Sequence, residues 1–317
     1  MKVLVAGGTG ALGRRVVRGL VEAGHTVAAS ARSTAGAQAI RDAGAGAIEL
    51  DVYDASAVRV AVAGHDAVLR LTTKIPPLRR MRSAAAWKET GRLRTQAARI
   101  MVDACIDAGV GAYVHESVVF VYADGADVWL DEDAPIDARP TPLRDAMNGE
   151  VNAVRFTAAG GRGVVLRFAG FYAADSAQTL AMAAMARRRR FALVGPSQNR
   201  FASIHLDDAA AATVAALTVP AGTYNIVDRD PLPLAEVLGS LAEAAGAPPL
   251  RHLPAWTGPL VLGEVWSYLR RSQRVSGERF RAATGWEPRF ADARAGYAAI
   301  AASWAGDGVT VSQGSPP

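Results

Sequence analysis

The sequence has one cysteine, Cys105, and only three lysines, Lys2, Lys74 and Lys88, among 317 residues. A single thiol excludes an internal disulfide and fits a reducing compartment. Cys105 lies in an amphipathic helix pattern, which predicts a buried, inert thiol rather than a nucleophile. No group of Cys and His residues has the spacing of metal ligands, so we expect no metal site.

Long hydrophobic runs are also lacking. The longest apolar stretch of membrane type, residues 180–186, is far shorter than the roughly 20 residues that cross a bilayer. The first residues already read as a strand, so no signal peptide is expected. We therefore expect a soluble, cytoplasmic protein with no membrane partner.

Aromatic residues make up only 7% of the chain, and the net charge of +5 comes mostly from arginine. This charge suits small anionic ligands such as phosphates, but it is too mild to indicate nucleic acid by itself. One dense run, residues 187–190, has no interleaved aromatics, so it reads as a solvated helix end. We expect a small-molecule substrate and no nucleic-acid partner.

Strand and helix patterns alternate through the first 170 residues, which indicates a parallel sheet covered by helices on both faces. The expected strands are 2–6, 25–30, 47–50, 67–71, one from 112 and 163–167. The expected helices are 11–23, 35–43, 55–63 and a long one at about 84–108. The predicted fold class is α/β: a Rossmann-type, doubly wound parallel sheet with a smaller C-terminal substrate lobe.

The alternation breaks after residue 170, where short segments containing proline appear. We predict a dinucleotide-binding domain over residues 1–170 and about 201–228. Residues 171–200 and 229–306 are predicted to form the substrate-binding lobe. The polar last segment, 307–317, is predicted to be a flexible tail.

Residues 7–13 read GGTGALG and stand between the first strand and the first helix. Gly7 suits the tight turn, Gly10 permits a close approach of a pyrophosphate, and Gly13 lets helix and strand pack together. The helix N-terminus supplies free N–H groups and positive potential. The predicted phosphate-binding residues are Gly7, Thr9, Gly10, Ala11, Leu12 and Gly13.

The end of the second strand decides between the two nicotinamide dinucleotides. An acidic residue there usually binds the free ribose 2′-hydroxyl of NAD. None occurs between Glu22 and Asp42, and the strand runs into Arg32 and Ser33. Arginine suits a 2′-phosphate, so we predict NADP(H) rather than NAD(H).

Two further positions complete the predicted adenosine end of this cofactor site. Arg14, directly after the last glycine, is predicted to flank the 2′-phosphate. Asp51 and Val52, after the third strand, are predicted to lie at the adenine.

Several segments, in order over about residues 1–300, resemble the extended short-chain dehydrogenase/reductases of the epimerase and dehydratase branch. They include VLVAGGTGALGRRVVRGL, GHDAVLRLTT, AGVGAYVHESVVFVYADG, LDEDAP, GVVLRFAGFY, FASIHLDDAAAATVAAL and SQRVSGERFRAATGWEPRF. The resemblance implies the same fold and a nicotinamide cofactor. It places Leu71, Thr72 and Lys74 near the nicotinamide, and Ser117 at the family's active-site serine.

The family's catalytic tyrosine, followed four residues later by lysine, has no counterpart in this sequence. No lysine follows Lys88, and no tyrosine has a lysine four residues after it. In the segment PTPLRDAMNGEVNAVRF, Leu143 and Met147 are the residues expected at those two places. With Val151 and Val154 they form an apolar stripe at helical spacing, either helix core or a remodelled pocket wall.

Another group must then move the proton, while Ser117 polarises a carbonyl. Tyr122 and Tyr172 are the leading candidates, and His115, Glu116 and Lys74 are others. His205, Asp207 and Asp208 are predicted to be structural, near a helix cap.

Three functions remain open from the sequence. The first is an NADP(H)-dependent reductase, dehydrogenase or epimerase of a small carbonyl or hydroxyl compound, with residues 187–190 or Arg200 binding an anionic group. The second is an isomerase, cyclase or dehydratase that still holds the cofactor but performs no redox step. The third is a redox sensor that binds dinucleotide and a protein partner. A homodimer through helices 84–108 and 146–159 is an open possibility.

Overall fold

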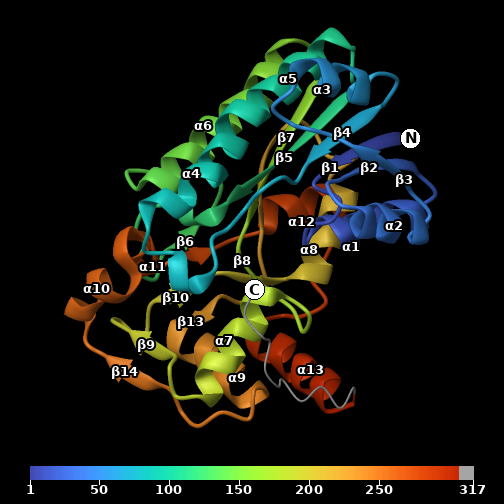
Figure 1. The fold of residues 1–317 in the computed structure, drawn as a ribbon. Helices are drawn as coiled ribbons and strands as arrows, with labels where there is room; N and C mark the ends of the chain where they lie inside the picture. Colours follow the sequence, from blue (N-terminus) through green and yellow to red (C-terminus); the bar gives the residue numbers. More distant parts are fainter. Residues whose placement is uncertain (307–317) are drawn as a thin grey trace.

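A seven-stranded parallel sheet forms the centre of the computed structural model, which describes residues 1–306 (Figure 1). The strand order is β12-β7-β5-β4-β1-β2-β3. These strands are β1 (Lys2–Ala6), β2 (Thr26–Ala31), β3 (Gly46–Glu49), β4 (Ala67–Arg70), β5 (Ala112–Val118), β7 (Arg162–Phe168) and β12 (Gly222–Ile226). The predicted fold class is confirmed, and the predicted tail, 307–317, lies outside the described residues.

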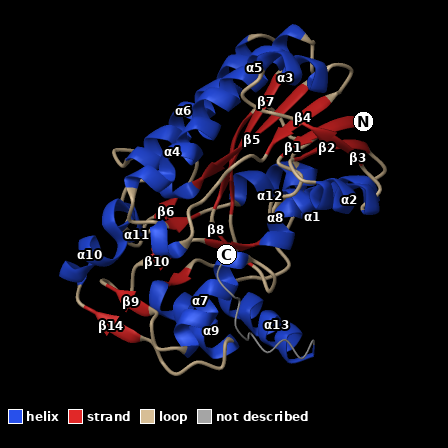
Figure 2. Cartoon of the chain, viewed as in Figure 1, coloured by secondary structure: helices blue, strands red, loops and turns tan. Residues whose placement is uncertain are grey.

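Helices cover both faces of this sheet, as Figure 2 shows. One face is covered by α1 (Gly13–Glu22), α2 (Thr34–Asp42), α8 (Leu206–Ala215) and α12 (Glu278–Thr284). The other is covered by α3 (Ala55–Val62), α5 (Ala98–Asp107) and α6 (Thr141–Ala158).

The alternation of side chains along β1 explains why this sheet has two cores. Val3 and Val5 join the cluster under α1 and α8, whereas Leu4 and Ala6 join the cluster under α3 and α5. Successive side chains of a strand point to opposite faces, so a strand covered on both sides is apolar throughout.

The helix expected at 84–108 is one continuous rod with an irregular turn in its middle. It consists of α4 (Ala84–Arg92), a π-helical segment (Leu93–Ala97) and α5. The π-helical segment brings Arg94 into the interior.

The smaller lobe contains α7 (Ala177–Arg187), α9 (Leu234–Ala244), α10 (Gly258–Leu262), α11 (Trp266–Leu269) and α13 (Ala293–Gly306). Short paired strands connect it: β6 (Trp129–Leu130) with β15 (Arg274–Val275), β8 (Gly170–Tyr172) with β11 (Ser203–His205), β9 (Ala192–Val194) with β14 (Arg251–Leu253), and β10 (Arg200–Phe201) with β13 (Leu232–Pro233). Although α12 falls in the predicted lobe, it packs on the sheet through Phe280 and Tyr224. The domain division stays a prediction.

The strand order of the sheet reverses direction beside β1. From β1 the chain moves outward to β2 and β3, then returns to β4 on the other side of β1. At such a reversal the connections leave in opposite directions and open a crevice at the carboxyl ends of the strands. The glycine loop, Leu71 and Ser117 all follow or end strands at this edge.

Candidate active site

The glycine loop between β1 and α1 is a tight turn built on contacts that exclude side chains. Gly7 has a φ of +98°, and a Cβ atom there would lie 2.7 Å from the carbonyl oxygen of Leu71. A Cβ on Gly13 would lie 2.0 Å from the carbonyl oxygen of Gly7. For Gly10 that distance is 3.3 Å, and the residue is exposed. Gly7 and Gly13 therefore shape the turn, whereas Gly10 lines its open side.

The open side of the loop suits a phosphate. Thr9, Gly10 and Ala11 are exposed, and Leu12, at the N-cap of α1, provides no side-chain acceptor. No side chain caps this helix, and the N–H groups of Arg14 and Arg15 donate to the carbonyl oxygens of Gly10 and Leu12. The positive potential of a helix N-terminus favours an anion at the exposed loop before it.

Arg14 and Arg15, in the first turn of α1, are bound to a carboxylate from the loop after β8. Arg14 pairs with Asp175 at 2.6 Å, and Arg15 pairs with both Asp175 and Asp207. Arg14 is predicted to flank the cofactor 2′-phosphate, and in this structure its guanidinium pairs with Asp175 of the chain itself.

At the end of β2, Arg32 is exposed and has no ion pair among residues 1–306. Ser33 caps α2, because its hydroxyl accepts a hydrogen bond from the Gly36 N–H at 3.1 Å. After β3, a carboxylate oxygen of Asp51 accepts the Tyr53 N–H at 2.9 Å, and Val52 is half-buried. The predicted adenosine-binding residues therefore all follow strands at one edge of the sheet.

The segment after β4 carries polar groups that lack partners. The hydroxyls of Thr72 and Thr73 are buried and have no hydrogen bond within the described chain. Leu71 is buried and Lys74 is exposed. A buried hydroxyl without a partner is costly, so these two oxygens fit the polar edge of a bound cofactor.

Ser117 and Tyr122 belong to one buried hydrogen-bond network. Ser117 donates to Glu150 at 2.5 Å, and Arg167 donates two bonds to the same carboxylate, at 2.9 and 2.7 Å. The Tyr122 hydroxyl accepts from Arg167 at 2.9 Å and donates to Asn225 at 2.8 Å. Burial raises the pKa of Tyr122 to about 12, which weakens it as an acid near neutral pH.

Tyr172 lies in a different buried cluster. Its hydroxyl donates to Asp228 at 3.1 Å, and Ser203 donates to the same oxygen at 3.0 Å. Burial raises the pKa of Tyr172, and the nearby Asp228 carboxyl raises it further. The structure therefore does not bring Tyr172 together with Ser117 and Tyr122 through any hydrogen bond of the described residues.

His115, His205 and Asp208, which the sequence also singles out, are buried. Burial lowers the pKa of His115 well below its usual value, and Arg70 and Arg94 lower it further, so this side chain is neutral. His205 caps α8 by accepting the Asp207 N–H at 3.2 Å. Asp208 accepts backbone N–H groups at positions 289 and 290.

Leu143 and Met147 of α6 lie in an apolar cluster that includes Val118 and Phe120, near the carboxyl end of β5. Leu143 is buried, and Met147 is half-buried against the same cluster. The other members are Met81, Trp87, Val118, Phe120, Val121, Ala138, Ala146, Val265, Tyr268 and Leu269. Charged groups also reach this cluster, since the Arg167 guanidinium lies 3.9 Å from the Met147 sulfur.

Sequence reasoning missed the buried ionic groups. Glu150 and Arg167 connect Ser117 to Tyr122, and Arg70 donates to the carbonyl oxygens of Thr72 and Leu93. Arg94 donates to the Pro142 carbonyl oxygen at 2.9 Å. The one available signal is an arginine within an otherwise apolar strand, as in AVLR and RGVVLRF.

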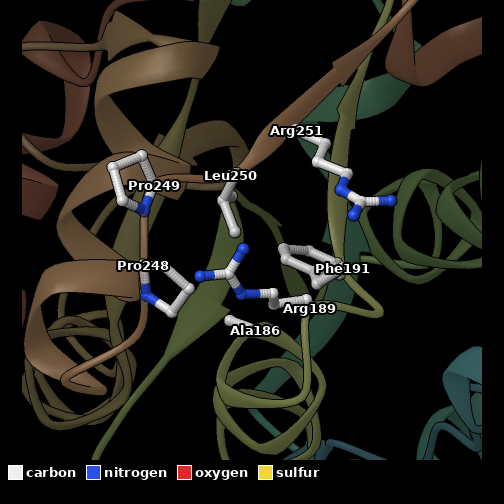
Figure 3. A pocket seen from close by; sticks show the side chains of 7 residues that line it. All are labelled: Ala186, Arg189, Phe191, Pro248, Pro249, Leu250 and Arg251. Carbon is white, nitrogen blue, oxygen red and sulfur yellow. The ribbon is translucent and has the colours of Figure 1, made fainter.

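A small cavity of about 20 Å³ lies in the lobe between the end of α7 and β14 (Figure 3). Arg189 projects between Pro248, Pro249 and Phe191, and its φ of 55° is unusual for a residue with a side chain. The cavity has room for about one water molecule. It is too small for an organic substrate.

Neither a metal centre nor a membrane-spanning helix occurs in the described chain. Residues 1–306 contain no group of three or more His, Cys, Asp or Glu side chains arranged to hold a metal ion. Within the same range, no helix combines the length and the apolar character needed to cross a membrane.

Comparisons with known proteins agree with this geometry. Residues 7–138 match a family model described as NAD(P)H-binding. The chain is 33% identical to a 3-diazoavenalumate denitrifying reductase of Streptomyces sp over 301 residues, which cover 91% of this chain and 96% of that one. It is 30% identical to a 2-alkyl-3-oxoalkanoate reductase of Stenotrophomonas maltophilia (strain K279a), covering 88% and 86%.

Solved structures share the fold over nearly the whole chain. One is a UDP-glucose 4-epimerase from Thermotoga maritima with UDP-glucose, at TM-score 0.78 and 18% identity, covering 97% of this chain and 99% of that one. Another is a human epimerase family protein with NADPH, at TM-score 0.77 and 23% identity, covering 95% and 99%.

Proposed function

We propose that this chain, which belongs to the extended short-chain dehydrogenase/reductases of the NAD(P)-dependent epimerase/dehydratase branch, is an NADP(H)-dependent reductase of a small organic substrate. The observation that carries the proposal is the glycine loop, whose uncapped helix N-terminus stands at the topological reversal of the sheet. Two relatives named as reductases, aligned over most of both chains, support the reaction class.

NADP(H) is preferred over NAD(H) in this proposal. Arg32, exposed and unpaired among residues 1–306, offers a guanidinium for a 2′-phosphate. The phosphates would lie at Thr9, Gly10 and Ala11, and the buried hydroxyls of Thr72 and Thr73 would gain partners. When bound, this cofactor supplies a hydride at its nicotinamide ring.

A carbonyl compound is the first substrate class we propose. Its reduction needs a proton on the oxygen as well as a hydride. Ser117, at the end of β5, could orient that oxygen only if its hydroxyl turned away from Glu150, to which it donates in this structure. Tyr122 and Tyr172, both buried and hydrogen-bonded, are better suited to structural roles. A water molecule or a group on the substrate would then carry the proton.

A diazo compound is the second candidate, favoured by the apolar Leu143 and Met147 at the places expected for the family's tyrosine and lysine. Hydride addition to the terminal nitrogen of an aryl diazonium gives an aryl diazene, which loses N₂ to leave the arene. These two reaction steps need no proton from the enzyme. They therefore suit a site without the tyrosine and lysine that the family uses. The relative named a denitrifying reductase supports this class.

The test begins with calorimetric titration of NADPH and NADH into the wild type and Arg32→Ala. We expect NADPH to bind more tightly than NADH, and Arg32→Ala to weaken only NADPH, by about tenfold. Arg18→Ala, which removes an exposed arginine of α1 instead of the one after β2, is the matched control. Absence of binding by either nucleotide would overturn the proposal and favour a non-redox enzyme that needs no cofactor.

Turnover separates the substrate classes once binding is established. NADPH oxidation is followed with a panel of ketones and with an ortho-quinone diazide, together with N₂ release. Oxidation with ketones supports the first class, and oxidation with stoichiometric N₂ supports the second. Nucleotide binding without any oxidation would favour a non-redox enzyme that holds the cofactor or a dinucleotide-binding sensor, and a partner-dependent change in binding would support the sensor.

Two further properties belong to the same proposal. Cys105 is buried and burial raises its pKa to about 12, so it is an inert thiol suited to the reducing cytoplasm.

A homodimer would cover Val151 and Val154, which project from α6 and are largely exposed.

A further inference from the structure

Residues 72–88, which we call the basic segment, carry positive charge that no acidic residue within the segment balances. It contains Lys74, Arg79, Arg80, Arg82 and Lys88 and no acidic residue, so its charge of +5 equals the net charge of the whole chain. All five side chains are exposed, and none makes an ion pair or a side-chain hydrogen bond within residues 1–306. Surface cations usually have acidic neighbours, so this accumulation points to an external anion.

The basic segment is fixed at both ends. At its start, Arg70 donates to the Thr72 carbonyl oxygen at 2.7 Å, and the Thr90 hydroxyl donates to the carbonyl oxygen of Lys74. Further along, the Trp87 indole N–H donates to the Met81 carbonyl oxygen at 2.8 Å. Its arginines are therefore presented by an anchored backbone.

Its path crosses the candidate active site. The segment leaves the carboxyl end of β4 and runs to α4, passing close to α11 of the lobe (cyan in Figure 1). Arg82 touches this part of the lobe, since a Cβ on Gly263 would lie 3.0 Å from its Cα atom. Met81 packs on the apolar cluster that contains Leu143 and Met147. Cations and an apolar wall thus border the same end of the sheet.

We propose that the basic segment binds the carboxylate of a substrate whose remaining body is apolar, so that the enzyme selects a hydrophobic organic acid. This inference rests on the proposed function, because it assumes that the substrate enters at the carboxyl ends of β4 and β5. Half-buried members of the apolar cluster such as Met81 and Met147 would hold the body, and Arg79, Arg80 and Arg82 would hold the charge. An arginine fork matches a carboxylate in shape as well as in charge.

The binding test compares an acid with its neutral isostere. Cinnamate and cinnamamide are titrated into the wild type in saturating NADP⁺ and into Arg79→Gln/Arg80→Gln/Arg82→Gln. We expect the triple variant to bind cinnamate about tenfold less tightly. Cinnamamide should bind the wild type less tightly than cinnamate does, with no change in the variant. Added salt should weaken only the binding of the acid.

A matched control removes the same charge from another surface. Arg18→Gln/Arg41→Gln/Arg59→Gln changes three exposed arginines on α1, α2 and α3, and it should bind cinnamate as the wild type does. Unchanged NADPH affinity in both triple variants shows that each is folded. A control that weakens cinnamate equally would mean that only overall charge acts, and the inference would fail.

Other results would overturn this inference without touching the proposed function. They are equal binding of acid and amide, no saturable binding of cinnamate, or tighter binding of UDP-glucose that the basic-segment variant abolishes. The last would point to a nucleotide diphosphate as the anion. If NADPH itself fails to bind the wild type, the proposed function fails, and cinnamate titrated without nucleotide still tests the basic segment.

Discussion

Ser117 donates its hydroxyl hydrogen to Glu150 over 2.5 Å. A serine hydroxyl carries one proton, so while this bond exists Ser117 has none to offer a substrate oxygen. Arg167 donates two further hydrogen bonds to the same Glu150 carboxylate, so both of its oxygens act as acceptors. The residue at the family's serine position is thus tied to the interior by a charge-assisted bond.

Glu150→Gln should be far more destabilising than Ser117→Ala. Losing the carboxylate leaves the buried Arg167 without its counter-ion, which costs about 3–5 kcal/mol of unfolding free energy. Losing the serine hydroxyl removes one hydrogen bond, worth about 1–3 kcal/mol because the acceptor is charged. Urea unfolding measures both, with the exposed Glu278→Gln as control. An effect of Glu150→Gln no larger than that of Glu278→Gln would contradict a buried ion pair.

The same serine variant tests whether the hydroxyl contacts substrate. If its proton stays with Glu150, Ser117→Ala should lower kcat by less than about tenfold, because a group that donates in the transition state is usually worth more. Steady-state turnover of NADPH with an accepted substrate measures this. A loss of several hundredfold in the still-folded variant would mean that the hydroxyl turns to the substrate.

Two glycines of the loop should separate folding from binding. Gly13→Ala places a Cβ 2.0 Å from the Gly7 carbonyl oxygen, a backbone clash that we expect to cost several kcal/mol of stability. Gly10→Ala meets that oxygen at 3.3 Å, so it should fold nearly as well as the wild type and yet crowd a pyrophosphate. Thermal unfolding and NADPH calorimetry distinguish the two. The larger Gly10→Val should crowd the pyrophosphate more than Gly10→Ala does. Normal NADPH affinity in Gly10→Val would show that the loop is not part of the cofactor site.

The sheet and the glycine loop could be predicted because their signals are local. Each of the expected strands lies within a few residues of an observed one, since a buried parallel strand is a short apolar run between turns. Three glycines between a strand and a helix likewise report on contacts within a few residues.

The interior of the site could not be predicted, because its bonds join distant residues. Ser117 and Glu150 are 33 positions apart, and Tyr122 and Asn225 are 103 apart. Nothing in the residues around Tyr122 indicates that its hydroxyl ends in the core rather than in a pocket. The π-helical segment that buries Arg94 has no sequence signal either, because α4 and α5 continue the same helical rod around it.

Asp228 should make stability fall as pH rises. Burial raises its pKa well above the usual value, although hydrogen bonds from Ser203 and Tyr172 oppose the shift. The folded state therefore binds the proton more tightly, and its stability declines from the unfolded carboxyl pKa, about 3.9, upward through the folded pKa. Asp228→Asn cannot ionise, so it should gain stability over the wild type as pH rises from 5 to 8. Urea unfolding across this range checks the difference, and parallel curves for the two proteins would refute it.

The outer face of α6 should mediate self-association. Val151 and Val154 are 54% and 66% exposed, and Val151 borders a groove between α6 and the segment containing Thr95 and Arg99. In a dimer through this face, Val151→Asp/Val154→Asp would bury unpaired carboxylates and raise the dimer dissociation constant by about a hundredfold or more. Sedimentation velocity should show a wild-type dimer and a variant monomer. Val60→Asp, at a valine 79% exposed on α3, should remain dimeric, whereas a monomeric wild type would contradict the homodimer.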